Sequence, residues 1–250
     1  MSFVIAVAGK GGIGKTTITG LIIRNLKARG KVPILAVDAD SNVNLAETIG
    51  FEEGKTVGAV REDFSSDISK MPPGMDKKTF LELKLNEAMV EGEGTDILAM
   101  GRGEGPGCYC PLNNMLRKFL DILANNYPFI VIDNEAGMEH LSRRILQEID
   151  ALLIVSDPTL KGIMTAGRIR DLTGELDLSI KDTYFIVNRI AGQLDPVIEK
   201  AMKKNGFTSF YGIPMDTLIS DYDLSLKPLT DLPDESIAVK AVDRILDEVI

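Results

Sequence analysis

The sequence has few cysteines and histidines and no long apolar run, and each of these features would mark a particular class of protein. Its 250 residues include two cysteines and one histidine. None of its apolar runs approaches the roughly 20 residues that a membrane-spanning helix needs. The first residues, Met-Ser-Phe-Val-Ile, lead directly into the strand before the glycine-rich loop, and they do not have the pattern of a signal peptide. We therefore expect a cytoplasmic protein without a transmembrane anchor.

Positive charge is also scarce. The 28 lysines and arginines are outnumbered by 37 aspartates and glutamates, which gives a net charge of -9. Nucleic acids attract proteins mainly through basic residues that neutralise phosphates. The last predicted helix, residues 235–249, mixes Lys240 and Arg244 with acidic residues, unlike a basic helix that anchors to anionic lipid. The sequence thus predicts neither a nucleic-acid partner nor a membrane partner.

The chain does contain short apolar runs that alternate with helical patterns. Buried strands are predicted at residues 3–7, 33–37, 96–100, 129–132, 151–155 and 184–187. Helices are predicted at residues 15–29, 77–90, 111–125, 160–176, 196–205 and 235–249. Residues 91–106 predict a loop around one short strand. This alternation predicts a single α/β domain over residues 1–250, with a mostly parallel central sheet and helices on both faces.

Residues 9–17 follow the first predicted strand and read Gly-Lys-Gly-Gly-Ile-Gly-Lys-Thr-Thr. A glycine-rich loop that opens a helix lets the backbone approach phosphate oxygens and direct its N–H groups at them. We predict a nucleotide-binding P-loop in which Lys15 contacts phosphate and the Thr16 hydroxyl binds Mg²⁺. The other loop residues expected to contact the nucleotide are Gly11, Gly12, Ile13, Gly14 and Thr17.

A second lysine, Lys10, follows the first glycine of the loop. Its position resembles the deviant Walker A loop of the P-loop ATPases that include MinD, ParA and the nitrogenase iron protein. In that class the extra lysine reaches the nucleotide of the partner subunit. The resemblance therefore implies an ATP-driven homodimer in which Lys10 and Lys15 both take part in catalysis.

Carboxylates follow two of the predicted strands, at the edge where parallel α/β sheets bind ligands. Asp38 and Asp40 come after residues 33–37, in a segment that resembles the first switch of the same class. We expect Asp40 to orient the attacking water and Asp38 to act near the metal. Asp133 comes after residues 129–132, where a Walker B aspartate holds the Mg²⁺ shell. Together they predict in-line attack of water on the γ-phosphate of ATP.

The residues after Asp133 resemble the second switch of that class. Gly137 occupies the position of a glycine whose amide senses the γ-phosphate. Glu135 stands where relatives often carry an uncharged residue, and it is either a second carboxylate near the metal or a solvated switch residue. His140, the sole histidine, is either a packing residue or a transient metal ligand.

Asn188 and Arg189 follow the predicted strand of residues 184–187. The resemblance implies that the Asn188 amide reads the adenine edge, with Arg189 beside it; the alternative is that Asn188 only caps the strand. Ile190 and Ala191 come next, without the carboxylate by which GTP-specific relatives hold guanine. ATP is therefore the predicted nucleotide.

The only two cysteines, Cys108 and Cys110, lie just before a predicted helix that Pro111 begins. Thiols near a helix N-terminus have a lowered pKa, which favours metal binding or redox chemistry, and a reducing cytosol disfavours a disulfide. A soft divalent metal usually takes about four ligands. Two chains meeting on a twofold axis would supply them, so we predict a metal-binding loop at about residues 101–111 that dimerisation completes.

These motifs, with the run Glu-Ala-Gly-Met-Glu-His-Leu at residues 135–141, resemble the CooC-type ATPases that mature nickel carbon monoxide dehydrogenase. The related maturation ATPases of acetyl-CoA synthase are equally similar. The resemblance covers essentially the whole chain. It implies that Cys108 and Cys110 of two protomers bind one nickel or zinc ion, and that ATP turnover drives nickel insertion into an apo-enzyme client.

Two alternatives remain open. A spatial-organisation ATPase of the MinD or ParA kind would carry the same P-loop. An iron–sulfur carrier like the nitrogenase iron protein would also bridge a metal group between subunits, although its two ligands per chain are far apart in sequence.

Overall fold

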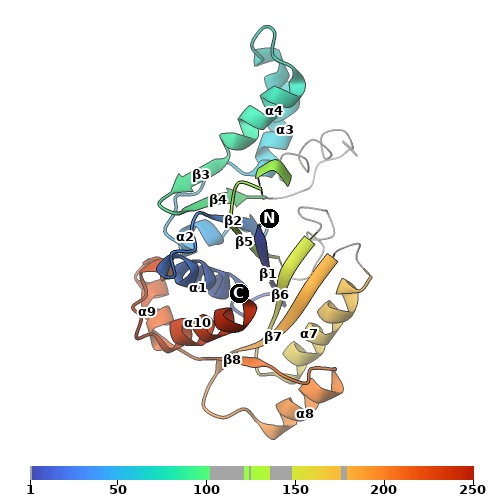
Figure 1. The fold of residues 1–250 in the computed structure, drawn as a ribbon, viewed down its shortest axis with the longest axis vertical. Coiled ribbons are helices and arrows are strands. Elements are labelled where there is room, and N and C mark those ends of the chain that lie inside the picture. The colour runs from blue at the N-terminus through green and yellow to red at the C-terminus, as the bar shows by residue number, and fades with distance from the viewer. Residues whose placement is uncertain (1, 102–120, 124, 136–147, 176–178) are drawn as a thin grey trace.

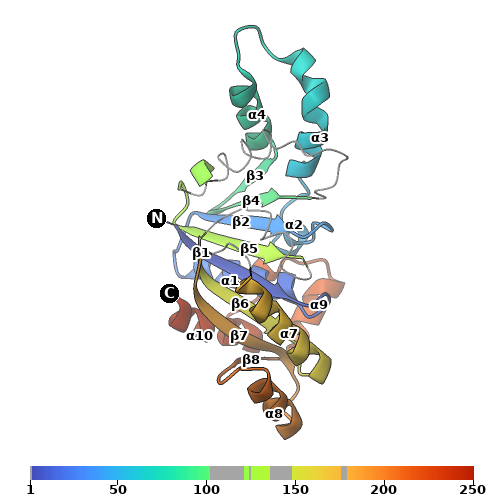
Figure 2. The same cartoon turned by 90° about the vertical axis from the view of Figure 1, so that its right-hand side faces the viewer.

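The computed structural model describes residues 2–101, 121–123, 125–135, 148–175 and 179–250. Its strands form one eight-stranded sheet of order β3-β4-β2-β5-β1-β6-β7-β8 (Figures 1 and 2). The strands are β1 (Phe3–Gly9), β2 (Ile34–Ala39), β3 (Met89–Gly92), β4 (Thr95–Ala99), β5 (Phe129–Asn134), β6 (Glu148–Ser156), β7 (Ser179–Ile190) and β8 (Tyr211–Pro214). Every pair in this sheet is parallel except β3 with β4. The predicted mostly parallel α/β architecture is confirmed.

Helices cover both faces of the sheet, and its central strands accordingly consist mainly of buried apolar residues. Along β1, Ile5 and Val7 pack in the cluster that contains α1 and α10, whereas Val4 and Ala6 pack in the cluster that contains α7 and α8. The described helices are α1 (Lys15–Ala28), α2 (Leu45–Thr48), α3 (Val57–Asp67), α4 (Lys77–Asn86), α7 (Leu160–Thr173), α8 (Pro196–Lys204), α9 (Thr217–Leu224) and α10 (Ile237–Val249), with 3₁₀ turns η1 (Ile68–Lys70) and η2 (Leu229–Asp231).

The helix predicted at residues 77–90 is wrong at its end. Helix α4 stops at Asn86, and Met89 and Val90 belong to β3, which runs antiparallel to β4. Gly94 has φ of 71° and supplies the tight turn of this hairpin, a conformation that favours glycine. The hairpin therefore takes residues 91–92 and 95–99 of the predicted loop of residues 91–106 into the edge of the sheet.

Helices α2, α3 and α9 were not expected from the sequence. Helices α3 and α4 form a hairpin that extends beyond the β3–β4 edge of the sheet (Figure 2). The two helices meet through Phe64 and Phe80, whose rings lie 6.1 Å apart and which belong to the same core cluster as residues of the central strands. The helix predicted at residues 111–125 lies mostly outside the described residues, and the assignment of all 250 residues to one domain stays a prediction.

Helix α10 packs its apolar face against α1. The Asn25 amide donates a hydrogen bond of 3.0 Å to the Val239 carbonyl, and Arg29 pairs with Asp243 at 2.8 Å and Asp247 at 2.7 Å. This helix therefore has no free apolar face with which to lie on a bilayer. Among the described helices, none is long and apolar enough to cross a membrane.

Candidate active site

The loop between β1 and α1 has the backbone that the P-loop prediction requires. Gly14 caps α1 with φ of 92°, and a Cβ built there would lie 2.6 Å from the Asn188 amide nitrogen. Only glycine fits this position, because other residues would be strained as well as crowded. Lys15 is 6% exposed, and its ammonium donates to the Lys10 carbonyl at 3.4 Å, while the Lys10 side chain is exposed. The loop thus holds Lys15 at its centre and leaves Lys10 at the surface.

Asn188 and Arg189 hold this loop from the end of β7. The Asn188 amide donates to the Ile13 carbonyl at 2.8 Å, and the Arg189 guanidinium donates to the Gly12 carbonyl at 3.0 Å. The Asn188 side-chain oxygen accepts from the Arg189 N–H at 2.9 Å. Both polar atoms of the Asn188 side chain therefore have partners within the chain. Its role in reading adenine stays a prediction.

Thr16 and Asp133 meet beneath the loop. The Thr16 hydroxyl donates a hydrogen bond of 2.6 Å to the Asp133 carboxylate. Burial raises the pKa of Asp133 to about 7, against the lowering effect of the Thr16 hydrogen bond, and the negative charge of Asp38 raises it further. The predicted Walker B aspartate thus lies at the start of the P-loop helix, in a place with an excess of negative charge.

Asp38 is fully buried and lies next to Asp133 across the β2–β5 pair. Its two oxygens accept hydrogen bonds from the Asp40 N–H at 3.0 Å and the Leu45 N–H at 2.8 Å. Burial raises the pKa of Asp38, and these backbone hydrogen bonds oppose that effect. Asp38 therefore shapes the loop that carries Asp40. Its predicted place near the metal, and the water-orienting role of Asp40, stay predictions.

The loops after β2 and β5 are joined by one hydrogen bond. The Ser41 hydroxyl donates to the Glu135 carboxylate at 3.0 Å. Glu135 therefore links the two predicted switch segments in this structure. Gly137, His140, Cys108 and Cys110 lie outside the described residues, so their predicted roles stay predictions.

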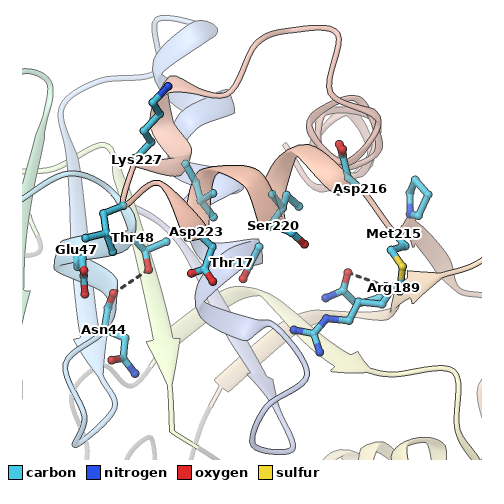
Figure 3. A pocket seen from close by; sticks show the side chains of 15 residues that line it. Thr17, Asn44, Glu47, Thr48, Arg189, Met215, Asp216, Ser220, Asp223 and Lys227 are labelled. Atoms are coloured by element: carbon cyan, nitrogen blue, oxygen red, sulfur yellow. Dashed lines mark hydrogen bonds between the residues drawn. The ribbon is translucent and has the colours of Figure 1, made fainter.

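A pocket of about 480 Å³ opens beside the first turn of α1 (Figure 3). Arg189 and Met215 lie toward one end, and Asn44 and Glu47 lie toward the other. Helix α9 forms one wall, and its Ser220 and Asp223 were missed by the sequence reasoning. Asp216 before an apolar run was a usable helix-start signal for α9, because its carboxylate accepts from the Leu218 N–H at 3.0 Å.

The family assignment follows from comparison with known proteins. Residues 4–229 match the CobQ/CobB/MinD/ParA nucleotide-binding domain. The chain belongs to this family. It is 42% identical over 249 residues to an uncharacterised ATP-binding protein of Methanocaldococcus jannaschii, covering 99% of this chain and 98% of that protein. It is 32% identical to the carbon monoxide dehydrogenase accessory protein CooC of Rhodospirillum rubrum, covering 88% of this chain and 90% of CooC.

Solved structures of the family have the same fold. The septum site-determining protein MinD of Pyrococcus horikoshii, complexed with Mg-ADP, matches with a TM-score of 0.68 at 20% identity, covering 100% of this chain and 96% of MinD. A ParA family ATPase from Chlorobium tepidum matches with a TM-score of 0.69 at 20% identity, covering 97% of this chain and 96% of that one. At such identities the likeness shows the fold alone.

The oxygen groups beneath the P-loop of this family member fit Mg²⁺, which prefers carboxylate, hydroxyl and phosphate oxygens. The raised pKa of Asp133, caused first by burial, marks a place where a cation would stabilise the ionised carboxylate. Over the part of the chain that the structure describes, no group of three His, Cys, Asp or Glu residues is arranged to hold a metal ion. A site for a softer metal is therefore not found among these residues.

Replacing Asp216 with alanine is expected to lower the free energy of unfolding by about 2–4 kcal/mol, because it leaves buried donors unpaired. Asp216 is 7% exposed, and its carboxylate accepts from the Ser236 hydroxyl at 2.6 Å and the Ala238 N–H at 3.1 Å. Burial raises its pKa, but these hydrogen bonds outweigh that effect and leave the pKa below its usual value. The contribution of the Asp216 carboxylate to the free energy of unfolding is thus present above about pH 4, and it is lost as the pH falls through the pKa of Asp216 in the folded protein.

Urea unfolding at pH 7 measures this loss. The control is Asp221→Ala, on the exposed side of α9, which should change stability by less than about 0.5 kcal/mol. Equal effects of the two substitutions would show that Asp216 does not fasten the pocket wall to α10.

Proposed function

We propose that this chain hydrolyses ATP in a Mg²⁺-dependent reaction at the P-loop, as part of a nickel-insertion cycle. The observation that carries the ATPase proposal is the contact of Thr16 with Asp133 directly beneath the P-loop, with a nucleotide-sized pocket beside it. Membership of the nucleotide-binding family supports the same reaction.

In this proposal the residues of the chain bind and orient the triphosphate. The N–H groups of the P-loop and the Lys15 ammonium bind phosphate oxygens, while Thr16 and Asp133 hold the Mg²⁺. The metal, when bound, neutralises charge on the phosphates. Asp40 orients the attacking water, since its loop is fixed through the Asp38 carboxylate beside Asp133. These groups are preorganised by hydrogen bonds, so little reorganisation is needed on reaction.

The exposed side chain of Lys10 acts across a dimer interface in the proposed cycle, where it contacts the partner's nucleotide. Cys108 and Cys110 of both protomers bind one nickel or zinc ion, which is cargo for an apo-enzyme client such as carbon monoxide dehydrogenase or acetyl-CoA synthase. Support for this step is the Cys-Tyr-Cys sequence and the 32% identity to the accessory protein CooC. A nucleotide and a metal that both bind the dimer better than the monomer strengthen each other's apparent affinity.

The test is anaerobic size-exclusion chromatography with light scattering and metal analysis of chelator-washed protein. Adding Ni²⁺ or Zn²⁺ is expected to raise the dimer fraction and to give roughly one metal per dimer, the count expected for four thiolates. The matched variant is Cys108→Ser with Cys110→Ser, which should lose the metal and keep ATP hydrolysis in the absence of metal cargo. Metal binding that survives in this variant would contradict the proposed ligands.

The other candidate is a spatial-organisation ATPase, which the MinD-like fold also allows. ATP-dependent cosedimentation with anionic vesicles or with DNA, without a cysteine-dependent metal, would favour it. The packing of α10 against α1 argues against a membrane role for that helix.

A further inference from the structure

The loop that follows β2 has an unusual backbone conformation at Val43. Its φ of 50° lies in the left-handed region, which a β-branched residue rarely adopts. Such a conformation is strained, and it persists only where the surrounding contacts fix the chain firmly. Residues 40–42, directly before Val43, make contacts of this kind. They include Asp40, which the proposed function assigns to the attacking water.

Each of residues 40–42 is held by a hydrogen bond to a side chain. The Asp40 N–H donates to the Asp38 carboxylate at 3.0 Å, and the Asn42 N–H donates to the Asp40 carboxylate at 2.9 Å. Between them, the Ser41 hydroxyl donates to the Glu135 carboxylate at 3.0 Å. Of these acceptors only Glu135 comes from another strand, because it follows directly on β5. Glu135 therefore ties the loop after β2 to the neighbouring strand.

The two oxygens of the Asp40 carboxylate differ in their contacts. The Asn42 N–H and the Asn42 side-chain amide both donate to Oδ1, at 2.9 and 3.1 Å. Within the part of the chain that the structure describes, Oδ2 accepts no hydrogen bond. A carboxylate orients a water molecule by accepting a hydrogen bond from it, so Oδ2 is the oxygen available for this task. Its position depends on the backbone of residues 40–43, which the contact of Ser41 with Glu135 fixes.

Glu135 follows Asp133 by two residues, in a region where negative charges already oppose one another. Burial first, and then the charges of Asp38 and Asp40, raise the pKa of Asp133. A further carboxylate adds to this repulsion, whereas an uncharged side chain would not. The Glu135 carboxylate, however, supplies an acceptor for the Ser41 hydroxyl, which an apolar side chain could not supply. The contact with Ser41 thus offsets the cost of placing a charge there.

We propose that Glu135 is a positioning residue for ATP hydrolysis, which acts through Ser41 to hold residues 40–43 so that Oδ2 of Asp40 faces the attacking water. The inference rests on the proposed ATPase function and deepens it. Glu135 acts here through its acceptor oxygen and not as a ligand of Mg²⁺. The two readings differ in what a glutamine at this position would do, because glutamine keeps an acceptor oxygen and loses the charge.

The experiment measures kcat for ATP hydrolysis by the whole protein with Mg²⁺, and ADP affinity by isothermal titration. Glu135→Ala should lower kcat roughly 10-fold, the lower end of the range for one hydrogen bond to a charged group, because both side chains are partly exposed. Its affinity for ADP should stay close to that of the wild type, which also shows that the variant is folded. Glu135→Gln should keep most of the wild-type kcat.

Ser41→Ala tests the other side of the contact. It should lower kcat by the same factor as Glu135→Ala, and the double variant should lose no more than either single variant, because both substitutions remove one hydrogen bond. The control is Glu148→Ala, an exposed glutamate at the start of β6 and thus at the opposite edge of the sheet, which should leave kcat unchanged.

Four results would overturn the proposal. An unchanged kcat in Glu135→Ala would show that the contact does not serve hydrolysis, and a raised kcat would show that it only holds a resting state. Loss of activity in Glu135→Gln, with normal activity in Ser41→Ala, would assign Glu135 a role through its charge. These three results leave the ATPase function in place. Absence of hydrolysis in the wild type would overturn the proposed ATPase function together with this inference.

Discussion

Replacing Lys15 with alanine is expected to lower the rate of ATP hydrolysis by about 10²- to 10³-fold, the usual cost of removing one preorganised group that stabilises transition-state charge. Lys15 is 6% exposed and held in the loop through the Lys10 carbonyl, so water replaces its ammonium poorly. Phosphate release under saturating ATP and Mg²⁺ measures the rate. Lys27→Ala, in the last turn of the same helix, is the control and should leave the rate unchanged.

The proposed action of Lys10 on the partner's nucleotide can be tested separately from the role of Lys15 by mixing variants. Lys10→Ala and Lys15→Ala proteins should each be inactive alone, and an equimolar mixture should regain roughly a quarter of wild-type activity. Half of the dimers would be mixed, and each would hold one site with both lysines. A mixture that stays inactive while the variants do exchange subunits would show that Lys10 acts within its own chain.

Asp133→Asn is expected to abolish Mg²⁺-dependent hydrolysis and yet to stabilise the ligand-free protein. Burial first, and the nearby charge of Asp38, raise the pKa of Asp133 from 3.8 to about 7. The folded protein therefore binds this proton more tightly than the unfolded chain, so wild-type stability falls as the pH rises from about 4 to 7. The asparagine variant has no carboxyl group at this position, so its stability does not fall in this way as the pH rises. Its gain in unfolding free energy should be small at pH 5 and largest at pH 8, with about 4 kcal/mol as the upper limit.

Urea unfolding of both proteins at several pH values, without nucleotide and with EDTA, measures this difference. Asp40→Asn is the matched control, because Asp40 is only partly buried and the asparagine keeps the acceptor for the Asn42 N–H. It should reduce hydrolysis and change stability less than Asp133→Asn does. A stability difference between Asp133→Asn and the wild type that does not vary with pH would refute the assignment of the raised pKa.

The elements that the sequence predicted well are those whose own residues specify them. The run of residues 3–7 is apolar because both faces of β1 are covered, and the loop of residues 9–17 needs glycine at Gly14 whatever surrounds it. Helices α1, α7, α8 and α10 carry clear caps or periodicity, and each lies within a few residues of its predicted range. Strand β3 was missed because its residues continue the pattern of α4, and only pairing with β4 makes them extended.

The residues of the candidate site, like the elements of the fold, were only partly predictable from the sequence. Lys15, Thr16 and Asp133 were identified from the P-loop string and from a carboxylate at a strand end, both of which are local signals. Ser220 and Asp223 carry no such signal, because a serine and an aspartate on a short polar helix are ordinary surface residues. Their place in the pocket depends on the position of α9 beside the first turn of α1.

The sequence by itself determined the glycine-rich loop after the first strand, the alternation of strands and helices that predicts a mostly parallel sheet, and the two cysteines as candidate metal ligands. These depend on residue type and spacing within single segments. Only the tertiary structure decided that Asn188 fastens the P-loop through the Ile13 carbonyl, that Asp38 lies beside Asp133, and that α9 closes the pocket. Each of these is a contact between segments far apart in the chain, and such contacts follow from strand order and packing, which local residue patterns do not encode.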